Sequence, residues 1–431
     1  MILFYFLISI LPMERHPIWN NIVGDMTVIK YVGLACLPYA LFYLLIRRIS
    51  PSFFGTWQAR FFMALYVLAT ISRFTLGGST SRFLDHWLSY GAFLLLYFMT
   101  LCVVDSEQRL RTTLLVAIGS VGYCSLYVLR EYQKGIREYS PYRPGWVVGD
   151  PNYFAVAVLA CAPLAYLLVQ DKTRPKWQRG FCLGSLILSL TAMMLGASRS
   201  GFLGLAASAF YLTCRLNHRV RNLVIMTVVL LVAAVVIPNS PLHRLVQPDS
   251  NDDEAVGNRY VVWRGALRMV ADHPFFGVGL DNFRRVRMYV RDEEIPPGQS
   301  VANVAHNSFL DIAAELGLPA LVLFLAILFF AWRTCEQVRR KAQQTGQKFL
   351  QRVALGFQAG WIGAGVANLF ISAQYEKLVW LLIFLSACLP PLVSAAAYES
   401  EKASFATVRI RPGAKPLTVA TARSHPSSAI R

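Results

Sequence analysis

Long apolar blocks alternate with short polar segments along most of this chain. The hydrocarbon core of a bilayer requires about 20 residues of helix to cross, and many of the blocks approach that length. They predict helices over residues 1–12, 27–46, 61–77, 86–104, 112–129, 152–170, 181–195, 201–214, 223–238, 318–332, 353–372 and 377–396. The pattern therefore predicts an all-α, polytopic helical membrane protein with about 12 transmembrane helices.

The composition agrees with a membrane protein and excludes an ordinary soluble domain. Hydrophobic residues make up 55% of the chain, and the mean hydropathy is +0.44. The block over residues 1–12 has no basic residue ahead of it and no small-residue cleavage site after it, so we expect a short first helix. The eight cysteines lie in apolar blocks or at their ends and form no CxxC pair, which favours packing roles over disulfides.

Lysine and arginine gather in alternate connections, as they do in the cytoplasmic loops of membrane proteins. The clusters are Arg47, Arg48 and Arg60; Arg109 and Arg111; Lys172, Arg174, Lys176 and Arg179; Arg215, Arg219 and Arg221; Arg333, Arg339, Arg340, Lys341, Lys348 and Arg352; and Lys402, Arg409, Arg411 and Lys415. This alternation predicts that both ends of the chain are cytoplasmic. The net charge of +18 is then explained by loops that face anionic lipid headgroups, so membrane lipids are expected partners and nucleic acid is not.

One connection is far longer than the others and divides the chain. Residues 1–238 are expected to form transmembrane helices 1–9, and residues 309–397 helices 10–12. Between them, residues 239–308 form a long outside loop, and residues 398–431 form a basic cytoplasmic tail that we expect to be disordered. Within the loop, NRYVVWRGALRMVADHP predicts an amphipathic helix that ends at Pro274, and QPDSNDDEAVGN before it is acidic and expected to be mobile.

Arginines of this loop are candidates for binding phosphate, because the guanidinium group donates two parallel hydrogen bonds and keeps its charge. At 100° per residue Arg264 shares a helix face with Arg268, whereas Arg259 lies about 140° away from Arg264. The alternative is that these arginines only snorkel to the membrane surface or pair with acidic residues of the loop, which are Asp272, Asp281, Asp292, Glu293 and Glu294. Arg199, in the short segment GASRSGFLG between two apolar blocks, is a further candidate, because arginine close to the bilayer core is costly and marks functional pockets.

His306 precedes a predicted helix that ends at Gly317. Asn307 or Ser308 is the expected N-cap, and Ser308 with Asp311 has the form of a capping box. A helix N-terminus lowers the pKa of a histidine and favours the neutral form that a general base requires. The alternative is a histidine at the membrane boundary that only faces water.

Together these segments resemble the bacterial O-antigen ligase and polymerase superfamily. The resemblance is carried by GVGLDNF at 277–283, AHNSFLDIAAELG at 305–317, the preceding NRYVVWRGALRMVADHPFFGVG, SRSG at 198–201 and GDPNYFA at 149–155. It covers the motifs between residues 149 and 317 and the hydropathy pattern of the whole chain. GVG alone is no nucleotide-binding signature, since no strand precedes it.

The resemblance implies an enzyme of the bacterial inner membrane whose site faces the periplasm. It would move O-antigen glycan from undecaprenyl diphosphate to a hydroxyl of lipid A core oligosaccharide, with inversion at the anomeric carbon. His306 would be the base, and Arg199 with Arg259 or Arg264 would bind the diphosphate. No cofactor or metal is expected.

Four alternatives remain open from the sequence. The same superfamily includes O-antigen polymerases and protein O-oligosaccharyltransferases, and nothing in the residues identifies the acceptor. A transporter of lipid-linked sugars would also have many helices and cationic side chains, although no inverted repeat is evident. A metal-assisted mechanism would use Asp249, Asp252, Asp253 and Glu254 as oxygen ligands, but we expect that segment to be solvated.

Overall fold

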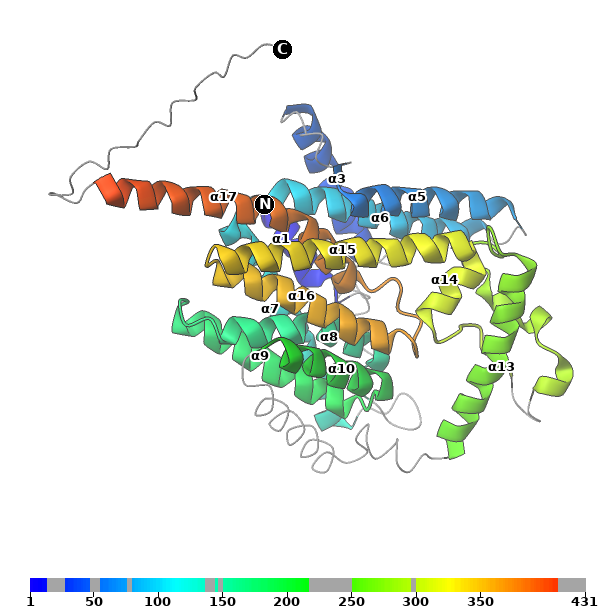
Figure 1. The fold of residues 1–431 in the computed structure, drawn as a ribbon. Coiled ribbons are helices and arrows are strands. Elements are labelled where there is room, and N and C mark those ends of the chain that lie inside the picture. The colour runs from blue at the N-terminus through cyan, green and yellow to red at the C-terminus, as the bar shows by residue number, and fades with distance from the viewer. Residues whose placement is uncertain are drawn as a thin grey trace, which may run out of the picture. The chain divides into compact units, whose positions relative to one another are not determined.

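The computed structural model describes residues 1–13, 28–46, 55–75, 80–135, 144–145, 150–216, 250–295 and 300–409. These residues form helices and connecting loops, and no strand occurs among them, which confirms the predicted all-α class (Figure 1). The predicted span over 223–238 and the end of the tail, 410–431, lie outside the described residues.

The helices follow the apolar blocks closely in the first half of the chain. They are α1 (Ile2–Ile10), α3 (Val28–Ile46), α5 (Trp57–Ile71), α6 (Thr80–Val103), α7 (Glu107–Lys134), α8 (Pro151–Val169), α9 (Lys176–Leu195) and α10 (Arg199–Arg215), with the short 3-10 helix η1 (Ser72–Phe74) after α5. The second half contains α13 (Ser250–Asp272), η3 (Phe283–Tyr289), η4 (Asp292–Glu294), α14 (Ser308–Leu316), α15 (Leu318–Gln344), α16 (Lys348–Ala367) and α17 (Lys377–Arg409).

Six helices of the described part of the chain are long and apolar enough to cross a membrane. They are Arg82–Val103 of α6, α7, α8, α9, α15 and Lys377–Ser394 of α17. This establishes the membrane-helix character of the protein. The count of about 12 spans remains a prediction, because α1 and α5 are shorter than a membrane crossing needs and the predicted span over 223–238 lies outside the described residues.

Helix occurs in part of two segments, one predicted to be mobile and the other predicted to be disordered. The acidic segment before Asn258 belongs to α13 from Ser250 onward, which suits carboxylates near the positive end of a helix dipole. The tail expected to be disordered from residue 398 continues α17 to Arg409, because AYESEKASFATVR contains neither glycine nor proline and is rich in helix formers.

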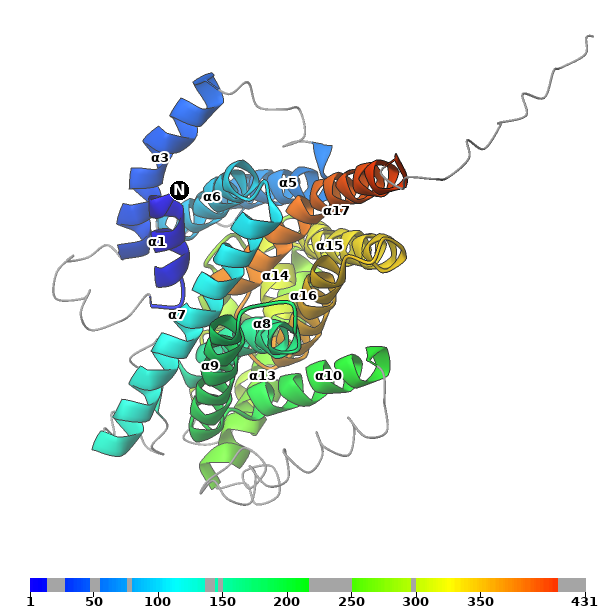
Figure 2. The same ribbon diagram turned by 90° about the vertical axis from the view of Figure 1, so that its left-hand side faces the viewer.

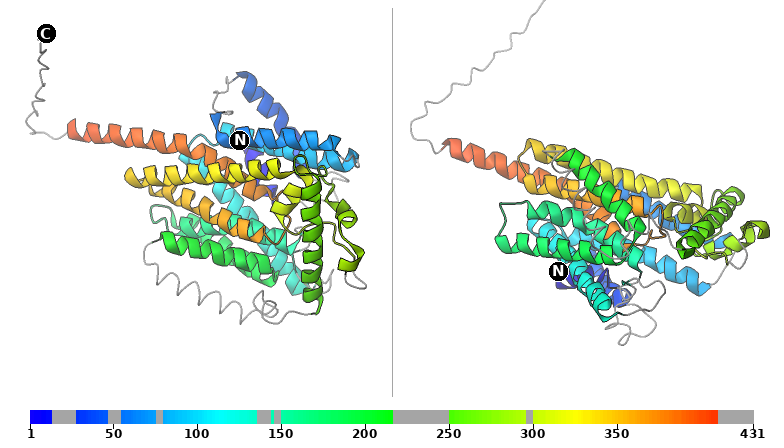
Figure 3. Two further views of the ribbon diagram at one scale, coloured as in Figure 1. Left: turned by 45° about the vertical axis from the view of Figure 1, so that its right-hand side comes forward. Right: turned by 90° about the horizontal axis from the view of Figure 1, so that it is seen from below.

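Helix α8 lies among α7, α9, α10 and α16, and fifteen of its nineteen residues are buried (Figures 1 and 2). Close approach of α10 depends on Gly201, where a Cβ atom would come within 2.6 Å of the Ala155 Cβ. Helix α15 packs against α5 and α16, and α14 leads into it at Gly317. Helix α13 contacts α14 and η3 beside this end of the bundle (Figure 3).

Candidate functional site

Two glycine-containing segments interlock by direct backbone contact. The Val278 and Gly279 amides donate hydrogen bonds of 2.9 Å each to the Ala314 and Glu315 carbonyls at the end of α14. Gly277 has a φ of 62°, and a Cβ there would lie 2.3 Å from the Glu315 carbonyl. Gly317, with φ 86°, meets the Phe275 carbonyl in the same way. The glycines are therefore required both by their positive φ and by the absence of a side chain.

The buried Glu315 side chain completes this junction. Its Oε1 accepts a hydrogen bond of 3.2 Å from the Phe283 amide, which fixes the start of η3. Burial, with the nearby Asp311 carboxylate as a second cause, raises the pKa of Glu315 to about 8. The side chain is therefore a structural acid that joins α14 to the turn after Gly279.

His306 lies between Ala305 and Asn307, and hydrogen bonds fix both of these neighbours. The Trp263 indole of α13 donates a 2.7 Å hydrogen bond to the Ala305 carbonyl, and the Ala305 amide donates one of 3.1 Å to Asp311. Asn307 is the N-cap of α14 and accepts hydrogen bonds from the amides of the next turn. His306 itself has a φ of 50°, a left-handed conformation that non-glycine residues seldom adopt. The surrounding contacts thus hold a strained backbone in place.

Ser308 does not form the predicted capping box. Its hydroxyl donates to the Ile371 carbonyl at 2.8 Å and accepts from the Ala373 amide at 2.8 Å, while Asp311 instead binds the amide of Ala305. Of the two N-caps considered from the sequence, Asn307 is therefore the one used. Ser308 attaches the His306 segment to the connection between α16 and α17.

The first turns of α8 and α10 contact each other, and α8 also contacts the connection that holds Ser308. Asp150 is the N-cap of α8 and accepts a hydrogen bond from the Asn152 amide. The Ser198 hydroxyl, the N-cap of α10, donates to the Asn152 side chain at 2.8 Å. The Tyr153 hydroxyl donates to the Ser372 carbonyl at 2.7 Å and so links α8 to the connection that holds Ser308.

Arg199 is the first residue of α10 and follows its N-cap Ser198 directly. Its side chain is half-buried. The backbone from which it projects is thus fixed to the start of α8, the helix end that also carries Asp150.

The half-buried His306 imidazole has a strongly shifted acidity. Burial and the positive charge of Arg259 lower its pKa to about 4, and the Asp150 carboxylate opposes this shift. Arg259 of α13 and Asp150 of α8 therefore both act electrostatically on His306. The direction of the shift agrees with the prediction from the helix N-terminus, but burial and the arginine are the main causes.

Arg264 lies on another face of α13. Arg268 makes a bidentate pair with Glu294, with distances of 2.6 and 2.7 Å, and Arg264 approaches the same carboxylate at 4.0 Å. The side chain of Arg264 is 69% exposed. The alternative considered from the sequence, pairing with loop carboxylates, thus describes Arg264, while Arg259 is the arginine that influences His306.

Sequence reasoning gave no role to Asp150, Trp263 or Ser372. Asp150 does have a signal, since an aspartate directly before a proline is a typical N-cap. The carbonyl of Ser372 has none, because a backbone contact between distant segments leaves no trace in residue types. Of the proposed metal ligands, Asp249 lies outside the described residues, as do the side chains of Asp252, Asp253 and Glu254.

A sequence model of the family described as O-antigen ligase matches residues 184–325 of this chain. The match begins within α9, ends within α15 and includes Arg199, Arg259, Arg264 and His306. It confirms the resemblance inferred from the motifs. A search of curated proteins finds no match to the chain.

Proposed function

We propose that this protein is an O-antigen ligase. It transfers O-antigen glycan from undecaprenyl diphosphate to a hydroxyl of lipid A core oligosaccharide, at the periplasmic face of the bacterial inner membrane. Support comes from the family match over residues 184–325 and from the membrane-helix character of the chain. The single observation that carries the proposal is the family match, because it spans Arg199, Arg259 and His306.

His306 acts as the general base. The acceptor hydroxyl gives its proton to the imidazole, and its oxygen attacks the anomeric carbon of the donor. The bond from that carbon to the diphosphate oxygen breaks, and its electron pair leaves with undecaprenyl diphosphate. Direct displacement inverts the anomeric centre.

A pKa of about 4 makes free His306 a weak base, because a base is most effective when its pKa lies near the working pH. A donor diphosphate next to Arg259 would counter the positive charge that lowers this pKa. The imidazole would then become more basic once the donor is bound. Substrate binding thus prepares the base for the acceptor.

Arg259 and Arg199 bind the departing diphosphate. Positive charge placed in advance stabilises the negative charge that develops on the leaving group, so no metal is needed for this role. Arg259 is preferred over Arg264 because Arg264 is exposed and lies 4.0 Å from Glu294. The backbone of Arg199 is fixed to the start of α8 through Ser198, on the same helix end as Asp150.

The test is transfer of a polyprenyl-diphosphate glycan to lipid A core by purified protein. Wild type is compared with His306→Ala, with addition of a chelator, and with His273→Ala as a control, since His273 follows α13 and its imidazole contacts the Tyr289 hydroxyl at the end of η3. We expect transfer that His306→Ala abolishes and that the chelator and His273→Ala leave intact.

Other products would point to the remaining alternatives. Elongation of the donor without transfer to lipid A core would identify a polymerase, and glycosylated serine or threonine a protein O-oligosaccharyltransferase. Movement of the donor across vesicles without any transfer would favour a transporter. Loss of ligation on chelation would contradict the metal-independent mechanism.

A further inference from the structure

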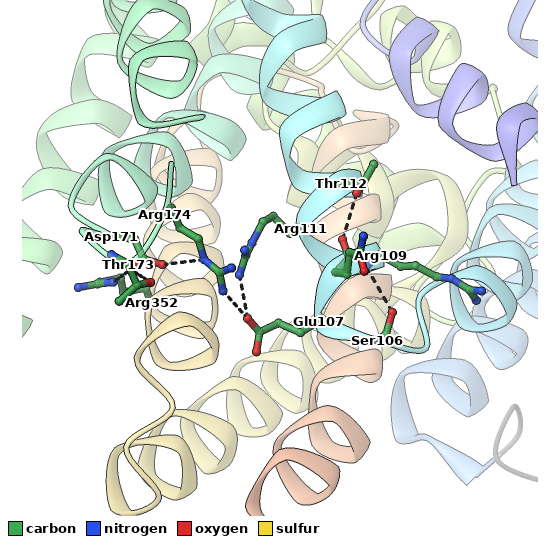
Figure 4. A network of polar contacts seen from close by, with 10 residues as sticks. Ser106, Glu107, Arg109, Arg111, Thr112, Asp171, Thr173, Arg174 and Arg352 are labelled. Carbon is green, nitrogen blue, oxygen red and sulfur yellow. Dashed lines mark hydrogen bonds and ion pairs between the residues drawn. The ribbon is translucent and has the colours of Figure 1, made fainter. Parts of the chain in front are cut away.

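A cluster of arginines lies at the opposite end of α8 from His306. Asp150 marks the start of α8, and its end at Val169 is about 28 Å farther along the helix at 1.5 Å per residue. There the α8–α9 connection meets the start of α7 and the first turns of α16 (Figure 4). The cluster is therefore separate from the candidate catalytic site.

Two carboxylates hold this cluster together. Glu107 accepts hydrogen bonds from Arg111 at 2.8 Å and from Arg174 at 2.7 Å (Figure 4). Asp171, whose side chain is 2% exposed, lies 2.9 Å from Arg352 and 3.6 Å from Arg174. These contacts connect three separate segments and fix the arginines in space.

Positive charge exceeds negative charge in the cluster. Arg111, Arg174, Arg352 and Arg179 accompany only the two carboxylates, and Arg179 donates to the Val169 carbonyl at 2.8 Å. The buried Nε–H group of Arg111 has no hydrogen-bond acceptor among the residues that the structure describes, whereas the Arg174 Nε faces the Asp171 Oδ2 at 3.6 Å. Buried donors without acceptors are costly, so an anion that supplies oxygen atoms would be favoured there.

A small pocket opens beside these arginines. It is lined by Arg111, Leu115, Leu168, Arg174, Gln178, Arg179 and Cys182. The polar lining lies at the helix ends, and Leu115 and Cys182 each lie about one helical turn farther into the bundle than Arg111 and Gln178. Arginines at the opening and apolar side chains deeper in the pocket fit a molecule that joins a phosphate to a hydrocarbon chain.

From this arrangement we propose that the pocket binds the phosphate group of an anionic phospholipid, such as phosphatidylglycerol or cardiolipin. Basic pockets between transmembrane helices on the cytoplasmic side are a recurring way to bind such headgroups. Bound lipid would complete the contacts among α7, α9 and α16 and stabilise this end of the bundle.

The test follows thermal unfolding of the full-length protein in detergent micelles by tryptophan fluorescence. Separate samples receive cardiolipin, phosphatidylglycerol, phosphatidylcholine or inorganic phosphate. The variants are Arg174→Gln, Arg179→Gln and Arg179→Lys, which keeps the charge. Arg109→Gln is the matched control, because Arg109 pairs with Asp105 and extends away from the cluster (Figure 4).

We expect the anionic lipids to raise the unfolding temperature of the wild type more than phosphatidylcholine does. Arg174→Gln and Arg179→Gln should each lose half or more of this difference, while Arg109→Gln and Arg179→Lys keep most of it. Equal shifts with all lipids, or an equal loss in Arg109→Gln, would overturn the proposal. Inorganic phosphate that reproduces the full shift would also overturn it, by identifying a site for free phosphate.

Discussion

The Trp263 indole donates a 2.7 Å hydrogen bond to the carbonyl of Ala305, the residue that precedes His306. Arg259 lies one helical turn before Trp263 and lowers the pKa of His306. One face of α13 thus both positions the His306 segment and supplies charge to it. Arg264 and Arg268 lie on another face of α13 and pair with Glu294 instead.

Loss of the Trp263 hydrogen bond is expected to reduce activity without unfolding the protein. Trp263→Phe keeps the apolar ring and removes the N–H donor, which is worth about 1 kcal/mol and corresponds to roughly a fivefold to tenfold fall in kcat/KM. Glycan transfer by the purified variant measures this. Trp177→Phe is the control, since Trp177 is 66% exposed on α9, and a similar loss there would argue against a positioning role for Trp263.

Arg259 and Arg264 are expected to differ sharply although they lie on one helix. Arg259→Gln removes a charged donor from the diphosphate and should lower kcat/KM about 10-fold to 100-fold. Arg264→Gln breaks only an exposed contact and should change it by less than about threefold. Kinetics of both variants at one ionic strength provide the comparison, and equal losses would refute the assignment of the diphosphate to Arg259.

Hydropathy predicted the helices well because the apolar run is itself what a membrane helix requires. It misplaced the polar ends, since α7 begins at Glu107 under a Ser106 cap and α15 continues to Gln344 beyond the apolar stretch. Helix propagation depends on hydrogen bonding and on the absence of breakers, so a helix extends past the residues that hydropathy recognises. The same reason explains the helical residues up to Arg409.

The sequence named candidate residues for the site, whose roles remain predictions, but it did not predict the contacts that hold them. The angle of 100° per residue separated Arg259 from Arg264 correctly, yet which face meets His306 depends on the contact between α13 and the Ala305 carbonyl. Ser308 was predicted to cap α14 because Ser308 and Asp311 have the spacing of a capping box. Its hydroxyl instead binds Ile371 and Ala373, which are more than sixty residues away. Contacts of that range cannot be read from a local pattern.

Gly277→Ala is expected to disrupt the fold far more than the same change at Gly135. Both glycines have a φ of 62°, so each alanine has the left-handed cost of about 1–2 kcal/mol. Only at Gly277 does the added Cβ also meet a carbonyl, 2.3 Å away, whereas nothing lies within 4 Å at Gly135. Thermal unfolding in detergent compares them, and similar stabilities would show that the contact between Gly277 and Glu315 is not essential.

Glu315→Gln is expected to preserve the fold, and Glu315→Ala is not. Alanine leaves the Phe283 amide without its acceptor, at a cost of about 1–3 kcal/mol. Because the pKa is raised from 4.5 to about 8, the stabilisation by the protonated glutamate is complete below pH 4.5 and is lost as the pH rises to about 8. Unfolding at pH 4 and pH 9 should therefore show Glu315→Gln close to wild type at pH 4 and more stable than wild type at pH 9. Greater stability of the wild type at pH 9 would contradict a raised pKa.

The pH dependence of catalysis should show that the donor changes the acidity of His306. The acid limb of kcat/KM reports the free enzyme, so it should fall near pH 4, where the imidazole becomes protonated. The limb of kcat reports the complex and should lie at higher pH, because the bound diphosphate counters the charge of Arg259. Asp150→Asn removes a negative charge that favours the imidazolium, so it should move the limb of kcat/KM to lower pH.

Removal of the Arg259 charge should have the opposite effect, because Arg259 disfavours a second positive charge nearby. In Arg259→Gln both acid limbs should move to higher pH, because the arginine no longer lowers the pKa of His306 and the charge of a bound donor still raises it. Profiles of wild type and both variants between pH 3.5 and 8 test this, and protein recovered at pH 7 after each acid exposure controls for unfolding. Coincident limbs of kcat and kcat/KM in the wild type would mean that the donor does not tune His306, and the arginine would then act on the leaving group alone.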